Sequence, residues 1–212
     1  KELLRQGKTL VDARCGGTSG CVETGAFGKE NYCLTGYFNL TKILELALCN
    51  GYDFRTDRQL GPGTGKVEDF TTFSRLFEAY STQLKYFTDL KIEGNRRIER
   101  LYAERLPVPF LSVLIDDCIE KGTDYHAGGA RYDTSYIQGV GLGTVTDSLS
   151  AIKTHVFEKK NLSMEELTCI LRRNFSNRGD ERIRQLFINR TPAYGNDDDA
   201  ADSIMVDVFN AF

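Results

Sequence analysis

The stretch GGTSGCVETGAFGKENY, from Gly16 to Tyr32, places a thiol two residues before a carboxylate on a glycine-rich backbone. In an extended segment, residues i and i+2 point to the same side, so Cys21 and Glu23 can face one substrate. A cysteine hydrolase needs a thiolate, and a carboxylate nearby opposes thiolate formation because like charge raises the pKa of a thiol. The pair therefore favours chemistry in which a neutral thiol works beside a carboxylate base.

Radical chemistry meets that description, because a thiyl radical forms from a neutral S–H group by loss of a hydrogen atom. Cys21 would then remove a hydrogen atom from carbon, and Glu23 would take a proton from a neighbouring hydroxyl or ammonium group. Two other interpretations stay open. One is a cysteine hydrolase with His126 as its base, and the other is a structural cysteine beside a surface glutamate on a glycine-rich turn.

The bulk properties of the chain limit the classes of function. It has 212 residues, enough for one large or two small domains, and its formal net charge of -3 gives no case for binding nucleic acid or an anionic membrane. No apolar run reaches the length of a membrane-spanning helix. The six cysteines lack the spacing of a disulfide framework or a zinc site, which favours reduced thiols and a cytoplasmic protein.

Hydrophobic periodicity and capping residues predict a mostly helical chain. We expect a helix over residues 40–50 with Asn39 as its N-cap and Gly51 at its end, and a long helix over 68–105 that Gly94 breaks. A further helix should end at Gly122. The remaining helices are expected over residues 146–159, 164–173 (with a capping box of Ser163 and Glu166), 180–190 and 199–212.

Short buried strands joined to these helices by glycine-rich loops indicate an α/β architecture. We expect one short extended segment over residues 135–138. The stripe formed by Ile204, Val208 and Phe212 on the last helix is expected to be exposed and to need a partner, so we interpret the chain as part of a longer polypeptide.

Two glycine motifs resemble phosphate-binding loops only superficially. In LGPGTGKV, Leu60 stands where a P-loop needs glycine, and Val67 stands where it needs serine or threonine. GVGLGT, from Gly139 to Thr144, opens a helix but lacks the third glycine of a dinucleotide fingerprint. It could offer N–H groups to an anion or simply form a tight turn between a strand and a helix.

Several other polar residues allow both a functional and a purely structural interpretation. Asp116 and Asp117 could reach a pocket, although adjacent carboxylates at a helix edge are more often solvated. Tyr132, Tyr136 and Gln138 could border the active site, although aromatic side chains in loops usually serve packing.

Three segments together resemble the glycyl radical enzymes. ARCGGTSGCVETGAFGKENYCLTGYFNLTKILELALCNGYD is similar to their active-site cysteine segment. QLGPGTG with the aromatic-rich helix after it, and GGARYDTSYIQGVGLGTVTDSLSAIKTHVFE, are similar to further stretches of the family. The resemblance covers essentially the whole chain and implies part of a ten-stranded α/β barrel, with a cysteine loop at about residues 15–37 that crosses the barrel interior.

The resemblance also implies a mechanism and partners. A radical stored on a glycine near the C-terminus of such enzymes passes to the cysteine, here Cys21. A separate activating enzyme that uses S-adenosylmethionine and an iron–sulfur cluster installs it, and no cofactor is bound directly. We further expect a small-molecule substrate and a homodimer, with no metal site, nucleic acid or membrane involved.

Within the family, Val22 and Glu23 after the cysteine match the eliminating and decarboxylating branches. The runs GCVETGAFGKENY and LTGYFNLTKILELAL are most similar to the branch that removes water from trans-4-hydroxy-L-proline to give a pyrroline-5-carboxylate. Other branches more often have proline where this chain has Thr24. In the hydroxyproline branch, Cys21 would carry the thiyl radical, Glu23 would be the base, and Tyr37 would line the substrate pocket. The alternatives are dehydration of a diol, cleavage of choline or a sulfonate, decarboxylation of an arylacetate, or a non-catalytic helical domain.

The glycyl radical motif of the family, Arg-Val-x-Gly followed by an aromatic residue, is absent from these 212 residues. We therefore interpret residues 1–212 as a partial catalytic barrel domain, without the N-terminal half and the glycyl radical domain. Such a piece is expected to be inactive by itself.

Overall fold

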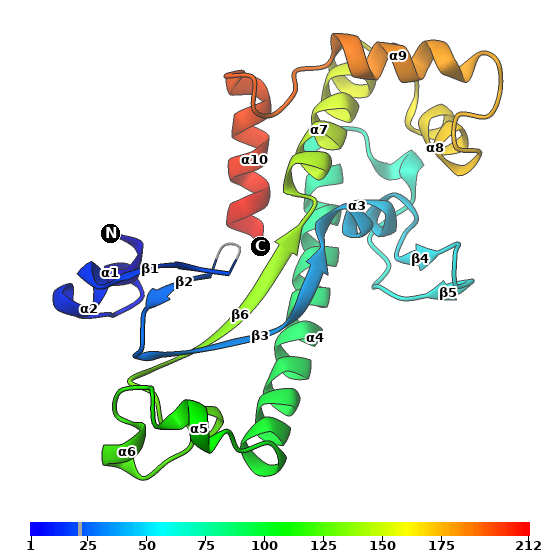
Figure 1. Cartoon of the computed structure of the whole chain (residues 1–212). Helices are drawn as coiled ribbons and strands as arrows, with labels where there is room; N and C mark the ends of the chain where they lie inside the picture. The colour runs from blue at the N-terminus through cyan, green and yellow to red at the C-terminus, as the bar shows by residue number, and fades with distance from the viewer. Residues whose placement is uncertain (21–22) are drawn as a thin grey trace. The chain divides into compact units, whose positions relative to one another are not determined.

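A computed structural model describes residues 1–20 and 23–212, and these form two compact units. The first unit comprises Lys1–Tyr37 and Lys91–Gln138, and the second comprises Phe38–Leu90 and Gly139–Phe212. Helices dominate both units, as the sequence predicts (Figure 1). In the described part of the chain, no helix is both long enough and apolar enough to cross a membrane.

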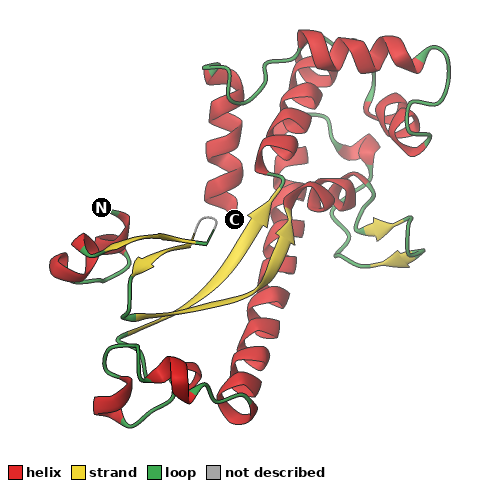
Figure 2. Ribbon diagram, in the orientation of Figure 1, coloured by secondary structure: helices red, strands yellow, loops and turns green. Residues whose placement is uncertain are grey.

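The first unit contains the second part of the long helix α4 (Phe73–Arg105), several short helices and most of the strands. Its elements are α1 (Glu2–Arg5), α2 (Leu10–Arg14), β1 (Gly16–Ser19), β2 (Glu23–Ala26), β3 (Glu30–Asn39), α5 (Pro109–Ser112), α6 (Cys118–Lys121), the 3₁₀ turn η2 (Tyr125–Ala127) and β6 (Tyr132–Val140), where β3 and β6 each end in the second unit. β1 and β2 form an antiparallel hairpin. β3 and β6 pair with each other, and their arrows point the same way in Figure 2.

The second unit is built mainly from helices. Its elements are α3 (Leu40–Leu48), β4 (Tyr52–Asp53), β5 (Arg58–Gln59), the 3₁₀ turn η1 (Val67–Asp69), the first part of α4 (Phe73–Arg105), α7 (Leu142–Ile152), the π-helical turn η3 (Lys153–Glu158), α8 (Met164–Arg172), α9 (Asp180–Arg190) and α10 (Asp199–Ala211). Its core forms where α7 packs against α3 and α10.

Local capping signals fix several helix ends as predicted. The Asn39 side chain accepts a hydrogen bond from the N–H group of Lys42 and begins α3. Ser163 and Glu166 form the predicted capping box of α8, and Gly122 closes α6 in the left-handed conformation.

The end of α3 differs in detail from the prediction. Asn50 and Gly51 both have left-handed backbones, with φ of +52° and +80°, and the N–H group of Gly51 bonds to the carbonyl of Leu46 at 2.7 Å. This pairing is the Schellman motif. The predicted stop is therefore confirmed, but asparagine takes the position that sequence reasoning gave to glycine.

The prediction for the long helix was wrong at two points. α4 begins at Phe73, because residues 67–69 form a 3₁₀ turn in which the Asp69 carboxylate accepts the N–H group of Lys66. The helix also continues through Gly94. A single interior glycine costs only about 1 kcal/mol relative to alanine, which tertiary packing easily offsets.

The last helix corrects another expectation. Ile204 and Val208 are not exposed: they are 3% and 0% exposed, on the helix that packs against α7. The ring of Phe212 lies 5.4 Å from that of Phe38. The stripe thus finds its partner inside the second unit, whereas Val206 and Phe209 lie on the exposed face.

The strands are longer than the sequence suggested. β6 covers nine residues where we expected a short extended segment over residues 135–138, and β3 covers ten residues. Each strand finds its hydrogen-bonding partner about 100 residues away along the chain, so no local pattern marks its ends.

Candidate functional site

The β1–β2 hairpin positions the predicted base. Its register pairs Gly16 with Ala26 and Ser19 with Glu23, so Glu23 is the first residue of β2. A Cβ atom on Gly20, which has φ of +57°, would lie 2.8 Å from Oε2 of Glu23. Glycine at this position therefore lets the carboxylate fold against the backbone. Cys21, the predicted radical residue, lies outside the described residues.

Two side chains hold the backbone of β2 beyond Glu23. Tyr136 on β6 donates its hydroxyl hydrogen to the carbonyl oxygen of Thr24 at 2.7 Å. The carboxylate of Glu30 accepts the N–H group of Ala26 at 2.7 Å. A Cβ atom on Gly25 would overlap Oε2 of Glu30, so the strand lies directly on this carboxylate.

Glu30 is a completely buried carboxylate that forms an ion pair and accepts several hydrogen bonds. Its side chain is 0% exposed and lies 2.9 Å from the Nζ atom of Lys8, which is 2% exposed. The hydroxyl of Thr134 donates to Oε1 at 2.6 Å, and that of Tyr136 lies 3.3 Å from the same oxygen. A charge pair this deep is tolerated because each charge has a partner and the carboxylate accepts further hydrogen bonds.

The charges around Tyr136 keep its hydroxyl protonated. Burial raises the pKa of this phenol, and the negative charges of Glu30 and Glu23 raise it further. A protonated hydroxyl can donate, as the bond to Thr24 requires. Because this hydroxyl binds the carbonyl oxygen of Thr24, the residue directly after Glu23, Tyr136 borders the candidate site.

Tyr32 lies against the same group. Its ring stacks on that of Tyr136 with a centroid separation of 5.8 Å. Burial, followed by the charge of Glu30, raises its pKa to about 12. In the described part of the chain its buried hydroxyl has no hydrogen-bond partner.

Other candidate residues of the first unit have different roles. Tyr37 lies on β3 with 66% of its surface exposed, outside the buried group formed by Lys8, Glu30, Thr134 and Tyr136. Tyr132 donates its hydroxyl hydrogen to the buried carboxylate of Asp12 at 2.7 Å and accepts the N–H group of Thr9. Tyr132 therefore anchors the N-terminal segment.

The adjacent carboxylates behave unequally. Asp117 pairs with Arg131 at 2.7 Å, and this hydrogen bond lowers the pKa of Asp117. The side chain of Asp116 is 53% exposed. The exposure of Asp116 fits a solvated edge, whereas Asp117 is used in an ion pair with Arg131.

The histidine alternative gains no support from the contacts of His126. Its Nδ1 atom lies 2.8 Å from the carbonyl oxygen of Leu106, which identifies it as the donor in this hydrogen bond. The ring packs against Tyr102 and Tyr125. The residue thus serves as a link between α4 and η2.

The loop that resembles a P-loop uses its N–H groups internally. Those of Thr64 and Gly65 bond to Oδ1 of Asn50 at 2.7 and 3.0 Å. Gln83 on α4 donates to the carbonyl of Pro62 at 2.6 Å. Through these bonds the loop packs tightly onto the end of α3 and onto α4, so its N–H groups have partners without a phosphate.

The second glycine motif also makes a turn. Gly141 caps α7 with φ of +84°, and a Cβ atom there would overlap Oγ1 of Thr41. A Cβ atom on Gly139 would lie 3.1 Å from the ring of Phe212. Close packing therefore explains two of the glycines in GVGLGT, as expected for a tight turn between a strand and a helix.

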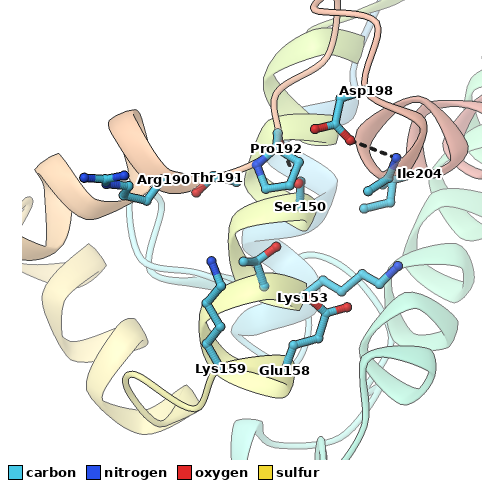
Figure 3. A pocket seen from close by; sticks show the side chains of 11 residues that line it. Ser150, Lys153, Glu158, Lys159, Arg190, Thr191, Pro192, Asp198 and Ile204 are labelled. Carbon is cyan, nitrogen blue, oxygen red and sulfur yellow. Dashed lines mark hydrogen bonds between the residues drawn. The ribbon is translucent and has the colours of Figure 1, made fainter.

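A cavity of about 370 Å³ lies within the second unit, between η3, the end of α9 and the start of α10 (Figure 3). Its lining includes three cationic residues, Lys153, Lys159 and Arg190. Figure 3 shows the side chains of Arg190 and Lys153 extending in opposite directions, so the positive charges do not converge on one ligand. None of the predicted site residues lines this cavity.

Sequence reasoning missed Lys8 and Glu30. Charged side chains in a glycine-rich segment normally suggest a solvated loop. The available signal was that Glu30 opens an apolar run rich in β-forming residues, which placed a charge at the start of a strand.

Comparison with known proteins identifies the family. The family model described as pyruvate formate lyase-like matches residues 1–212. The chain belongs to this family. Its structural neighbours are glycyl radical enzyme barrels, which confirms the predicted fold class.

Within the family, this chain is highly similar to a hydroxyproline dehydratase. The trans-4-hydroxy-L-proline dehydratase of Clostridioides difficile is 57% identical over 212 residues, which are 100% of this chain and 27% of that protein. The crystal structure of the same enzyme with trans-4-hydroxy-L-proline bound superposes with a TM-score of 0.94, covering 99% of this chain and 26% of the other.

More distant members of the pyruvate formate lyase-like family catalyse related eliminations. The (2S)-3-sulfopropanediol dehydratase of Klebsiella oxytoca is 33% identical, with 100% of this chain and 26% of that protein covered. The B12-independent glycerol dehydratase of Clostridium butyricum superposes with a TM-score of 0.90 at 36% identity, covering 99% of this chain and 26% of the other. The chain thus spans about a quarter of the length of these relatives.

Proposed function

We propose that this chain is part of a glycyl radical dehydratase that removes water from trans-4-hydroxy-L-proline. The observation that carries the proposal is the 57% identity to an enzyme of that name across the whole chain, against 31–37% for seven further relatives with dehydratase, sulfite-lyase or decarboxylase names. The Cys-Val-Glu sequence at the hairpin supports the same reading.

In the proposed reaction, the thiyl radical of Cys21 takes a hydrogen atom from a ring carbon of the substrate. Glu23 takes a proton from the neighbouring ring ammonium group and passes it to the hydroxyl group of the substrate, which leaves as water. Return of a hydrogen atom from Cys21 quenches the remaining radical and gives a pyrroline-5-carboxylate. Glu23 suits the role of base because it is the first residue of β2 and follows Cys21 by two residues in the sequence. Tyr37 is proposed to contact substrate.

The proposal includes the parts that the resemblance implies. The glycyl radical would be stored on a glycine outside this chain and installed by a separate S-adenosylmethionine-dependent activating enzyme. Residues 1–212 would be one portion of the catalytic barrel, with the cysteine loop at about residues 15–37. The assembled enzyme would be a cytoplasmic homodimer.

The test is anaerobic activation of the full-length protein, followed by assay with trans-4-hydroxy-L-proline. Cys21→Ser and Glu23→Gln should abolish turnover, while both variants still accumulate the glycyl radical measured by electron paramagnetic resonance. Cys33→Ser is the matched control, because Cys33 is a buried free thiol on β3 and should be dispensable for chemistry. Full activity in Cys21→Ser would refute the mechanism.

A substrate panel separates this proposal from its neighbours. Glycerol, 1,2-propanediol, isethionate and 4-hydroxyphenylacetate should give turnover at least about 100-fold slower than trans-4-hydroxy-L-proline, because a site built to bind one set of polar groups rejects analogues that leave those groups unpaired. Preference for one of the other compounds would keep the radical mechanism and overturn the substrate assignment.

A further inference from the structure

The backbone of β2 is fixed at two points just beyond the proposed base. The carbonyl oxygen of Thr24 is bound by the Tyr136 hydroxyl, and the N–H group of Ala26 is bound by the Glu30 carboxylate. Both contacts come from side chains, in addition to the ladder of the β1–β2 hairpin. They stop the strand from sliding or rotating relative to β3 and β6.

The first of these contacts lies close to Glu23. Thr24 follows it directly, so the plane of the Thr24 carbonyl and the direction of the Glu23 side chain are linked through only a few backbone dihedrals. Glu23 also has its carboxylate against the backbone of Gly20, which leaves it little room to compensate for a shift of the strand.

Glu30, whose Oε2 atom accepts the N–H group of Ala26, is a buried charge. The Oε1 atom of Glu30, which lies 3.3 Å from the Tyr136 hydroxyl, also binds Nζ of Lys8 at 2.9 Å. This ion pair is removed from solvent, so its geometry is not loosened by water. Lys8 and Glu30 thereby hold the tyrosine hydroxyl between a fixed carboxylate and the Thr24 carbonyl.

We propose that Tyr136, held by the Lys8–Glu30 pair, is a positioning residue that sets the direction of Glu23 in the dehydration reaction. The inference rests on the proposed function, because it assumes that Glu23 acts as the base. Tyr136 acts through the backbone of β2 and need not touch the substrate. A displacement of about 1 Å at a reacting group can cost about 100-fold in rate.

The test compares Tyr136→Phe with Tyr32→Phe in the activated full-length protein. The two rings stack on each other, and each substitution removes one buried hydroxyl, but only that of Tyr136 binds β2. Tyr136→Phe should lower kcat for trans-4-hydroxy-L-proline about 10- to 100-fold with KM changed less than about threefold. Tyr32→Phe should leave kcat within about twofold of the wild type.

Two further readouts separate positioning from a loss of structure. The glycyl radical content of Tyr136→Phe and its melting temperature should both match those of Tyr32→Phe. If kcat of Tyr136→Phe stays within twofold of the wild type, or if its loss is matched by an equal loss of folded, radical-bearing protein, the positioning role is overturned.

Should Tyr136→Phe not fold, the double variant Lys8→Met/Glu30→Gln takes its place. It removes both buried charges together, so Tyr136 and the N–H group of Ala26 lose the fixed carboxylate, and kcat should fall about tenfold with KM and glycyl radical content unchanged. A kcat within about twofold of the wild type in a folded, radical-bearing double variant would contradict the role given to Tyr136 and the ion pair.

The outcomes also distinguish this inference from the proposed function. If Cys21→Ser and Glu23→Gln are inactive while Tyr136→Phe is fully active, the dehydratase mechanism stands and the positioning role fails. If Glu23→Gln retains activity, the proposed base itself is wrong, whatever the Tyr136 variant does.

Discussion

The Nζ atom of Lys8 lies 2.9 Å from Oε1 of Glu30, and both side chains are almost completely removed from solvent. Removal of one partner leaves the other charge buried without compensation, which typically costs about 3–5 kcal/mol. We therefore expect Lys8→Met to lower the melting temperature of the full-length protein strongly. Lys8→Met/Glu30→Gln should recover most of that loss, as measured by differential scanning calorimetry. A double variant as unstable as Lys8→Met would show that the charges are not coupled.

Two glycines with free space around their α-carbons should respond oppositely to alanine. A Cβ atom would meet nothing within 4 Å at Gly94 or at Gly122, but Gly122 has φ of +59° whereas Gly94 lies inside α4. Gly94→Ala should stabilise the protein by up to about 1 kcal/mol, because alanine loses less backbone entropy in a helix. Gly122→Ala should destabilise it by about 1–2 kcal/mol, because an L-residue is strained in the left-handed region. Thermal unfolding of both variants checks the signs. Equal signs would contradict the backbone assignment.

Asn50 is expected to hold the glycine-rich loop through its side chain. Its Oδ1 atom accepts the N–H groups of Thr64 and Gly65, and its own backbone is left-handed. Asn50→Ala should cost about 1–3 kcal/mol, because two backbone donors lose their partner. Asn50→Asp keeps the acceptor and should lose much less. Hydrogen exchange at Thr64 and Gly65 provides the direct measurement: faster exchange is expected in Asn50→Ala only.

His155 on the π-helical turn should make stability depend on pH. It is 0% exposed, with Nε2 3.0 Å from the Thr191 hydroxyl and Nδ1 3.0 Å from Nδ2 of Asn161. Burial lowers its pKa, and the charge of Lys159 lowers it further. Its folded-state pKa is thus below the unfolded value of about 6.5. The neutral ring contributes fully above that value, and its contribution falls as the pH drops below it.

The measurement is the melting temperature of the wild type and of His155→Gln between pH 5 and pH 8. The wild type should lose more stability than the variant below about pH 6.5, since only the histidine must take up a proton on unfolding. Parallel curves for the two proteins would show that His155 does not titrate differently in the folded state.

Features that the sequence predicted well are local ones. The caps at Asn39 and Ser163 and the stop at Gly122 each depend on a few consecutive residues, so pattern and propensity suffice. The ends of β3 and β6 depend on pairing between segments about 100 residues apart. Neither hydrophobic period nor turn residues record that pairing.

In the candidate site, too, local residues could be predicted from the sequence and residues brought together by the fold could not. Cys21 and Glu23 stand out because they are two residues apart, and the neutral-thiol argument needs nothing more. Glu30 and Lys8 could not be found this way, since their burial arises only when the N-terminal segment, β3 and β6 come together. The sequence presents them as ordinary surface charges.

The anchoring of β2 has a consequence for attempts to move this chemistry elsewhere. The segment of residues 16–26, which contains β1 and β2, is short and glycine-rich and could be grafted onto another barrel. Its backbone, however, is held by side chains outside it. These are Lys8, Glu30 and Tyr136, which come from separate stretches of the chain. A transplant of this segment alone would carry the proposed reactive groups but not the side chains that fix the β2 backbone, whereas one that includes those three side chains would carry both.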